Sequence, residues 1–419
     1  MSRFSHILMP FIVLTAMSQA LQTWAGDWPQ VLGPDRNGRA TNERLADNWA
    51  SGGPKLVWRR QVGRGFAGVA VQGQRAVVFH RVDDQEIVEA LDAATGKTIW
   101  KRSFATRYKG QIFPDQDGPL CVPLIHKKQV FVYGAGGDAH ALNLADGKPQ
   151  WSRSLYREFR GRGGLIDYGY FGAGSTPIVA DNKLLINVGG AKNHGLVALD
   201  LTSGKMVWSA TDEGPSYSSP VAATNDGAEH VIFVTRFNCV SVDPKSGDVR
   251  FRFPFGKRGP TINGATPIVV GRHLFVSASY GVGATVVQFD ASSAKPVWAN
   301  DEVMSSQYNT CVYRDGYLYG TDGRADVGTG TLRCINFKTG RAAWSVNDFG
   351  IASVIIADDK LLILKDDGKL ILAKASPEEF QRLASAQILG DTVRALPALA
   401  HGKLFARDST TLKCFQVGE

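Results

Sequence analysis

Cysteine is scarce in this sequence of 419 residues, and no two cysteines are adjacent. The five lie far apart, at positions 121, 239, 311, 334 and 414. An odd and widely spaced set does not form the framework of a disulfide-stabilised protein, so we expect single buried thiols that pack as small apolar side chains. The eight histidines include no closely spaced pair, and the sequence therefore predicts no metal site.

Long apolar runs are missing after residue 25, so no transmembrane segment is expected there. Before it, Arg3 precedes an apolar run from Ile7 to Ala16 that is too short to span a bilayer, and small residues follow. This pattern predicts a signal peptide over residues 1–25, cleaved after Ala25 or, alternatively, after Ala20. Because no cysteine precedes Cys121, we expect no lipid anchor and a periplasmic or secreted location.

Charge of one sign is also not concentrated anywhere in the chain. Lysine and arginine number 47 against 39 aspartates and glutamates, for a net charge of +8. Since the excess is modest and spread along the sequence, it favours solubility, and no nucleic-acid partner is expected.

What the sequence does contain is a repeat that ends in an aromatic residue. Leu91 to Trp100 is the clearest copy, and the closing aromatics fall 43 to 57 residues apart. A period of this length is typical of a repeat architecture. In most copies an aspartate accepts backbone N–H groups of a turn and a glycine supplies the positive φ, and the closing aromatic packs on the adjacent sheet. The residues assigned to this structural repeat are Trp58, Asp92, Gly96, Trp100, Gly147, Trp151, Asp200, Gly204, Trp208, Asp243, Gly247, Phe251, Trp298, Gly340 and Trp344.

Alternating apolar runs before each turn predict short antiparallel strands. Eight copies of an opening strand can be found, at 68–71, 121–125, 175–179, 219–223, 265–270, 310–313, 353–357 and 396–400. Four-stranded sheets with two apolar faces bury both faces when they stack radially. The sequence therefore predicts an all-β fold, an eight-bladed β-propeller of four-stranded antiparallel blades over residues 54–419, preceded by a leader segment over residues 26–53.

Two places depart from the repeat. Ser376, Pro377 and Glu379 form a capping box, which predicts a short helix to about Ala384, followed by a closing strand over 386–389. The eighth unit ends at Glu419 before any closing strand, while Lys55 to Arg59 forms an orphan closing strand around Trp58. We therefore expect the N-terminal strand to complete the eighth blade and close the ring.

The Leu-Asp-x-x-Thr-Gly-x-x-x-Trp repeat resembles that of the PQQ-like (pyrroloquinoline quinone) β-propeller family, which includes quinoprotein alcohol dehydrogenases and the assembly protein BamB. The leader, with Asp27-Trp28-Pro29-Gln30 and Gly33 to Gly38, resembles that of secreted members of the family. The resemblance implies two functions. One is an exported, non-catalytic binding or scaffold protein, similar to BamB, that works as a monomer with an envelope or extracellular protein or a small polar ligand as partner.

The other implied function is a PQQ-dependent oxidoreductase acting on an alcohol or a sugar. Quinoprotein dehydrogenases hold PQQ against a tryptophan and a vicinal cysteine pair, with Ca²⁺ bound by glutamate, asparagine and aspartate. This sequence has no adjacent cysteines and lacks the long insertions that build the cofactor pocket in those enzymes. We therefore expect no cofactor, neither PQQ nor Ca²⁺, and no catalytic residues.

A binding site can still be predicted at the axis of the ring, where the segments entering the innermost strands meet. Small residues in these segments follow from crowding at the axis, which is a purely structural explanation. The alternative is a polar channel mouth that binds a sugar, a peptide or another small polar ligand. The residues expected to line that mouth are Arg162, Asp167, Tyr170, Tyr217, Asn263, Gln307, Tyr308 and Asn309.

Overall fold

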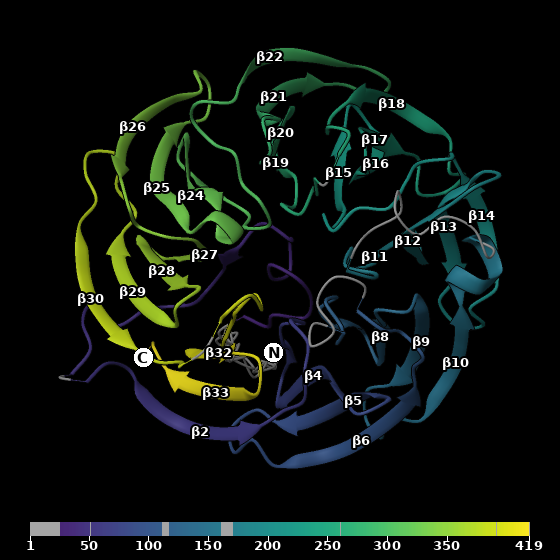
Figure 1. Ribbon diagram of the computed structural model, residues 1–419, viewed down its shortest axis with the longest axis horizontal. Helices are drawn as coiled ribbons and strands as arrows, with labels where there is room; N and C mark the ends of the chain where they lie inside the picture. Colours follow the sequence, from purple (N-terminus) through teal and green to yellow (C-terminus); the bar gives the residue numbers. More distant parts are fainter. Residues whose placement is uncertain are drawn as a thin grey trace, which may run out of the picture.

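Eight β-sheets surround a central axis in the computed structural model, which describes residues 26–50, 52–110, 117–160, 171–259, 261–390 and 392–418 (Figure 1). Seven of the sheets have four strands in chain order from the axis outward, one of them with a fifth strand at its inner edge, and the eighth sheet takes its outermost strand from the N-terminus. The all-β, eight-bladed propeller predicted from the repeat is confirmed. Among the described residues, helical structure is limited to η1 (Tyr156–Arg160) and η2 (Ala325–Val327).

The first four blades follow each other along the chain. Their strands are β3 (Ala70–Gln72), β4 (Arg75–Val82), β5 (Gln85–Asp92) and β6 (Thr98–Ala105); β7 (Leu124–His126), β8 (Gln129–Tyr133), β9 (Asp138–Asn143) and β10 (Pro149–Ser154); β11 (Ile178–Ala180), β12 (Lys183–Gly190), β13 (His194–Asp200) and β14 (Met206–Ala210); and β15 (Val221–Asn225), β16 (Ala228–Val234), β17 (Asn238–Val242) and β18 (Val249–Pro254).

The other four blades complete the ring. Their strands are β19 (Ile268–Val270), β20 (His273–Ala278), β21 (Gly283–Phe289) and β22 (Ala294–Asn300); β23 (Val312–Arg314), β24 (Tyr317–Arg324), β25 (Thr329–Asn336) and β26 (Arg341–Val346); β27 (Ala352–Ala357), β28 (Lys360–Lys365), β29 (Lys369–Lys374) and β30 (Arg382–Gln387), with β1 (Arg39–Ala40) beside β27; and β31 (Ala398–Ala400), β32 (Lys403–Arg407), β33 (Thr411–Gln416) and β2 (Lys55–Gln61).

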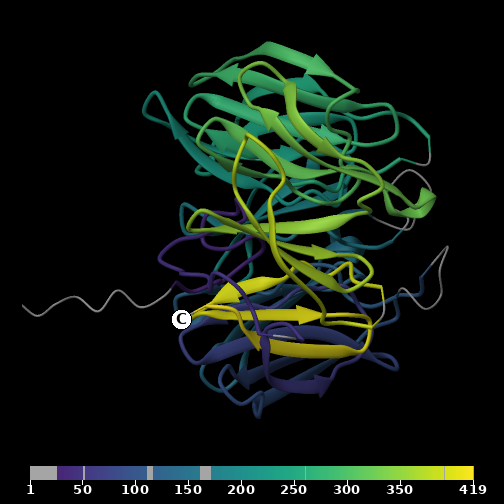
Figure 2. The same ribbon diagram turned by 90° about the vertical axis from the view of Figure 1, so that its left-hand side faces the viewer.

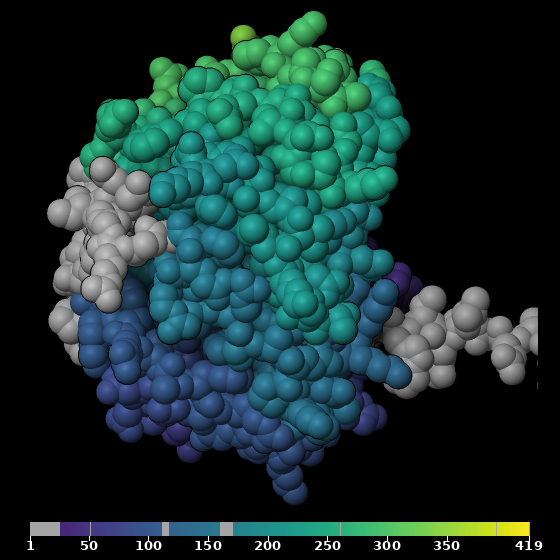
Figure 3. Space-filling model, turned by 90° about the vertical axis from the view of Figure 1, so that its right-hand side faces the viewer, coloured from purple at the N-terminus to yellow at the C-terminus, as the bar shows by residue number. Residues whose placement is uncertain are grey.

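The hydrophobic core lies between consecutive blades. The second and third strands of a blade are buried on both faces, as in β12 and β13, whereas the outer strand β6 alternates between buried and exposed residues. Separate clusters of buried side chains join blade 1 to blade 2, blade 2 to blade 3, and so on around the ring. Each sheet therefore buries its two apolar faces against its neighbours. The space-filling view of one side in Figure 3 shows neighbouring blades in contact with each other.

The ring is closed by strands from both ends of the chain. β2 pairs antiparallel with β33, from Lys55 opposite Gln416 to Gln61 opposite Thr411. In Figure 1 the purple strand β2 lies along the outside of the yellow strand β33. The predicted closure of the eighth blade by the N-terminal strand is confirmed.

The repeated tryptophan joins each blade to the turn of the next blade. The Trp58 indole N–H donates to the Ala93 carbonyl at 3.1 Å, and a Cβ added at Gly96, whose φ is +70°, would lie 2.7 Å from the Trp58 ring. The indole N–H groups of Trp100, Trp151, Trp208, Trp298 and Trp344 make the same kind of bond to the following blade, at 2.9, 2.9, 3.0, 2.9 and 2.9 Å. Positive φ angles occur at the turn glycines Gly147, Gly204, Gly247 and Gly340.

The turn aspartates hold these turns from within. The Asp92 carboxylate accepts the Thr95 N–H at 2.8 Å and the Ala94 N–H at 3.1 Å. Asp200 accepts the Ser203 N–H and Asp243 accepts the Lys245 N–H, both at 2.7 Å. The joint between blades 4 and 5 differs, because Phe251 has no indole N–H and instead packs against Phe289 at 5.6 Å between ring centres.

The helix predicted after Ser376 is wrong. The structure has a turn there, and the closing strand β30 begins at Arg382, earlier than expected. The Ser376 hydroxyl does accept the Glu378 N–H at 3.1 Å, as a helix cap would. However, the Lys374 N–H donates to the Gln381 carbonyl at 3.0 Å, which brings the two strands together after six residues, and no helix can propagate in that space.

The missing tryptophan of blade 7 has a topological explanation. Ala384, opposite Leu372, occupies the position that Trp344 occupies opposite Cys334 in blade 6. Blade 8 offers no turn for a tryptophan here, because its third and outer strands come from opposite ends of the chain. The leader residue Trp49 packs instead against the same hydrophobic cluster as Ala384.

The leader itself crosses the end of the central channel. Trp28 pairs with Val71 of blade 1, the Ile125 N–H of blade 2 donates to the leader at the Pro29 carbonyl, and β1 runs parallel to β27 of blade 7. We call this side of the ring, which carries the hairpins between first and second strands, the leader face. Figure 2 shows the purple leader on the left-hand face of the ring.

The five cysteines are buried and form no disulfide, which confirms the expectation of single buried thiols. Within the described ranges, no helix has the length and apolar character that a membrane span requires. The predicted signal peptide, residues 1–25, lies outside the described residues.

Candidate functional site

The channel is open on the side opposite the leader, where it forms a funnel of about 430 Å³. We call this side the funnel face; it carries the segments that enter the innermost strands and the loops between second and third strands. The floor of the funnel includes Val31 of the leader, which is 3% exposed. A concave site of this volume is within the range of small-molecule and side-chain pockets.

Most of the funnel wall is apolar, and the blades contribute to it in turn. Five rings line it, from Phe66, Phe171, Tyr217, Tyr280 and Tyr308. Aliphatic side chains lie between them, from Leu120, Val122, Ile262 and Leu396. Glycine is required where neighbouring blades approach each other: a Cβ at Gly264 would lie 2.7 Å from the Gln307 carbonyl oxygen. The small residues of the entry segments thus have a packing role.

One polar cluster lies on the funnel wall, where blades 5 and 6 meet. The Gln307 side-chain amide donates to the Tyr280 hydroxyl at 2.8 Å and to the Asp326 carboxylate at 2.9 Å, and its oxygen accepts the Ala325 N–H at 2.9 Å. Arg324 forms an ion pair with Asp326 and lies over the Tyr280 ring, 4.2 Å from its centre. The hydrogen bond from Arg324 lowers the pKa of Asp326, so this carboxylate is ionised and paired at neutral pH.

Tyr308 differs from the rest of this wall. Its hydroxyl oxygen is buried, and no hydrogen-bond partner for it occurs among the described residues. Burial raises the pKa of Tyr308 to about 12, so its hydroxyl remains a donor at neutral pH. On the adjoining wall, the Arg394 guanidinium lies over the Phe66 ring at 5.4 Å from its centre.

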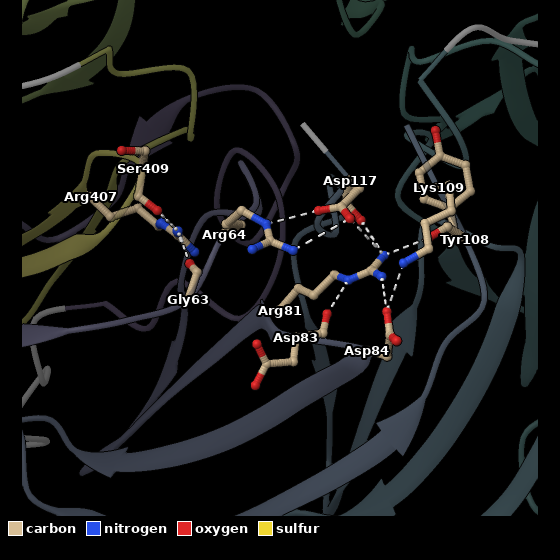
Figure 4. A network of polar contacts seen from close by, with 10 residues as sticks. All are labelled: Gly63, Arg64, Arg81, Asp83, Asp84, Tyr108, Lys109, Asp117, Arg407 and Ser409. Atoms are coloured by element: carbon tan, nitrogen blue, oxygen red, sulfur yellow. Dashed lines mark hydrogen bonds and ion pairs between the residues drawn. The ribbon is translucent and has the colours of Figure 1, made fainter. Parts of the chain in front are cut away.

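A second polar network supports the wall at blades 1 and 2 (Figure 4). The buried Arg81 guanidinium donates to the carbonyls of Asp83 at 2.7 Å and Tyr108 at 2.8 Å and pairs with the Asp117 carboxylate at 3.3 Å, while Arg64 donates to Asp117 at 2.9 Å. Since Arg64 and Asp117 lie close in sequence to Phe66 and Leu120, the network fixes two parts of the funnel wall.

The residues expected at the channel mouth fall into three groups. Tyr217, Gln307 and Tyr308 line the funnel. Asn263 and Asn309 are buried behind it: the Asn263 amide donates to the Thr235 carbonyl at 2.7 Å and that of Asn309 to the Ala352 carbonyl, so both hold neighbouring segments together. The other three, Arg162, Asp167 and Tyr170, lie outside the described residues.

Several funnel residues were not predicted from the sequence. Tyr280 and Asp326 come from loops between second and third strands, and Phe66 and Arg394 come from the entry segments of blades 1 and 8. Their position within the repeat could have predicted them, because the loops between second and third strands lie on the same side of the ring as the entry segments.

The funnel residues do not fit PQQ with Ca²⁺. Among the described residues that line the funnel, Asp326 is the single carboxylate, and its oxygens are taken by Arg324 and Gln307. A Ca²⁺ site needs several oxygen ligands, and in the described part of the chain no three His, Cys, Asp or Glu side chains are grouped to hold a metal ion. The adjacent cysteine pair is absent from the sequence as well.

Comparison with protein families gives a match over most of the propeller. The model of the family described as outer membrane protein assembly factor BamB matches residues 47–153 and 83–346. BamB of Yersinia pestis is 21% identical over 373 residues, which cover 75% of this chain and 87% of that protein. BamB of Burkholderia pseudomallei is 25% identical over 294 residues, or 59% of this chain and 70% of that protein.

Solved structures show the same fold. BamB from Moraxella catarrhalis superimposes with a TM-score of 0.62 at 15% identity, over 86% of this chain and 97% of that chain. The quinohemoprotein alcohol dehydrogenase from Comamonas testosteroni gives a TM-score of 0.65 at 15% identity, over 94% of this chain and 80% of that chain. At these identities, the structural likeness concerns architecture alone.

Proposed function

The chain belongs to the family of outer membrane protein assembly factor BamB, and from this membership we propose that it is an exported, non-catalytic β-propeller that binds proteins of the cell envelope as a scaffold. The observation that carries the proposal is the family match, which spans residues 47–346 and so includes most blades of the ring. The relatives whose sequences match are named for the assembly of outer membrane proteins.

The chemistry of the funnel supports binding rather than catalysis. The carboxylate that the structure describes on its wall, Asp326, has a lowered pKa and is paired with Arg324, so it is unsuited to act as a general acid. The rings and aliphatic side chains around it offer contact area instead. The proposed activity therefore needs no cofactor, neither PQQ nor Ca²⁺.

The proposed location is the periplasm or the exterior of the cell. It rests on residues 1–25, which have the charge and apolar pattern of a signal peptide. We expect cleavage after Ala25 and a monomeric mature protein without a lipid anchor. Sequencing the N-terminus of the exported protein tests the cleavage site directly.

Capture from cross-linked envelopes tests the function. The full chain carrying an affinity tag after Glu419 should be recovered from the periplasmic fraction together with components of outer-membrane protein assembly, and its loss should lower the amount of folded outer membrane proteins. The control is the same tagged chain without residues 1–25, which stays in the cytoplasm and should capture none of these components.

Two results would overturn the proposal. One is a fully exported chain that captures no assembly component, with outer membrane proteins unchanged when the chain is lost. The other is saturable binding of PQQ with Ca²⁺ accompanied by dye reduction with an alcohol or a sugar, which would make the protein an oxidoreductase.

A further inference from the structure

Two side-chain acceptors on the described funnel wall are already paired. On the wall between blades 5 and 6, the Gln307 oxygen accepts the Ala325 N–H, and the Asp326 carboxylate accepts bonds from Gln307 and Arg324. A sugar presents many hydroxyl hydrogens, each of which needs an acceptor when it is buried. This part of the wall is therefore poorly suited to a sugar.

The same wall retains one buried donor. The Tyr308 hydroxyl has no partner among the described residues, and a buried polar group of this kind costs free energy unless it is paired. The entry segment of blade 5 packs against the base of the Tyr308 side chain, since an added Cβ at Gly264 would lie 3.0 Å from the Tyr308 Cβ. A ligand that reaches this point must bring a hydrogen-bond acceptor.

The rest of the funnel calls for an apolar group. Its floor is formed by Val31, which packs in one cluster with Val122 and Leu396, and Ile262 lies on the wall. A space of about 430 Å³ accommodates one large side chain together with a short stretch of the backbone that carries it. Every hydrophobic residue of an extended polypeptide carries both groups, an apolar side chain and a neighbouring backbone carbonyl that can accept a hydrogen bond.

We propose that the funnel binds an extended polypeptide segment, taking up one aromatic or large aliphatic side chain, with a backbone carbonyl oxygen of the segment accepting a hydrogen bond from the Tyr308 hydroxyl. The inference rests on the proposed scaffold function and deepens it, because it makes an unstructured hydrophobic segment the partner at this site. Because hydrogen bonds of Arg81 and Gln307 hold the funnel wall in place, the site is formed before the segment binds.

Titration calorimetry with a blocked peptide tests this inference. The probe is acetyl-Gly-Gly-Phe-Gly-Gly-amide, and the matched control has serine in place of phenylalanine. The purified exported protein should bind the phenylalanine peptide at least about 10-fold more tightly than the serine peptide, because the serine side chain leaves the apolar floor empty. Maltose should not bind, since the acceptors of Gln307 and Asp326 on the wall are already paired.

Three variants assign the binding to the funnel. Ile262→Trp fills the space and should abolish binding of the phenylalanine peptide. Tyr308→Phe removes only the hydroxyl donor and should weaken binding by about 3- to 10-fold. Val327→Ser, an exposed position beside the funnel at the end of η2, should leave the affinity unchanged. Unchanged melting temperatures show that the variants are folded.

The outcomes separate this inference from the scaffold function. Equal affinity for the two peptides, or equal affinity of Ile262→Trp and the unaltered protein, would overturn the inference. Binding of phenylacetate without binding of the peptide would replace the segment by a free aromatic acid and overturn it too. A chain that fails these peptide tests but still captures assembly components keeps its scaffold function, whereas a failure of capture alone concerns the scaffold proposal.

Discussion

The two ends of the central channel use the chain in opposite ways. At the leader face the channel is filled by the protein's own N-terminal segment: the buried Arg36 donates to the Thr176 carbonyl at 3.2 Å and to the Pro220 carbonyl at 3.0 Å, and Glu43 accepts the His401 and Gly402 N–H groups at 2.6 and 2.7 Å. At the funnel face the wall is apolar, and the Tyr308 hydroxyl is left without a partner among the described residues.

This difference indicates that the leader face contributes to stability and that the funnel face is available for binding. The leader, which makes turns over residues 31–36, is held inside the channel by hydrogen bonds to the blades, so it serves closure. Val31 of the leader forms part of the funnel floor, and the funnel above it is a space that another molecule can occupy. Changes at the leader face should therefore alter stability, and changes at the funnel face should alter binding.

The largest effect is expected from breaking the ring. Deleting residues 54–62 removes β2, and with it the pairing to β33 and the contact of Trp58 with Gly96. The unpaired edge of β33 and the lost contact between blades 8 and 1 should lower the melting temperature by on the order of 10 °C or more. Thermal unfolding followed by circular dichroism measures the shift, and an unchanged melting temperature would refute closure by the N-terminal strand.

Arg36→Ala should have the next largest effect. Arg36 is 2% exposed, and its loss leaves buried carbonyls of blades 3 and 4 without donors, which should cost about 3 kcal/mol of unfolding free energy. Arg39→Ala, at an exposed position of the same leader, is the matched control and should change the free energy by less than about 0.5 kcal/mol. Equal losses in urea unfolding of the two variants would show that the leader is not held at Arg36.

Glu86 gives the funnel face its own pH dependence. Its carboxylate accepts the Ala135 N–H at 2.9 Å, and burial raises its pKa to about 7 from an ordinary value of 4.5. The folded state then binds more protons than the unfolded state between pH 4.5 and 7, so this group makes the protein less stable as the pH rises through that window.

Glu86→Gln removes that dependence. At pH 8 the variant should be more stable by about 2 kcal/mol, and the gain should vanish near pH 4.5. Urea unfolding across this pH range measures it. A variant that is less stable than the unaltered protein at pH 8 would show that the ionised carboxylate is stabilising where it lies.

The smallest effect is expected at the partly exposed pair of Asp27 and His401 on the leader face. The hydrogen bond that the His401 Nε2–H donates to the Asp27 carboxylate, at 3.0 Å, raises the pKa of His401. The stabilisation is therefore fully present below pH 6.5 and is lost as the pH rises through the raised pKa. His401→Gln should lower stability by less than about 1 kcal/mol at pH 6 and by less still at pH 9. A larger loss at pH 9 than at pH 6 would contradict this sign.

The sequence predicted the ring well, because the repeat acts locally. Asp92, Gly96 and Trp100 specify a turn and its contact with the next blade, and counting such units gives the number of blades. The helix after Ser376 was predicted from local signals alone, and the strand pairing of Lys374 with Gln381 overrode them. Similarly, only the three-dimensional position of Ala384 explains why blade 7 lacks a tryptophan.

The candidate site was harder to predict, because it consists of one or two residues from each of several blades. The polar type of Asn263 and Asn309 suggested a channel mouth, but both amides are used between neighbouring segments. Conversely, Phe66, Tyr280 and Arg394 have no motif in the sequence, and the ring alone brings them together at the funnel.

The most direct test of the scaffold proposal is photo-cross-linking from the two faces. A benzoylphenylalanine placed at Val327, which is 54% exposed beside the funnel, should cross-link to a component of outer-membrane protein assembly in the envelope. The same group at Lys97, exposed in a turn on the leader face, should give no such product. Cross-linking from Lys97 alone would place the partner on the closed end of the channel and contradict the assignment of the funnel face as the binding face.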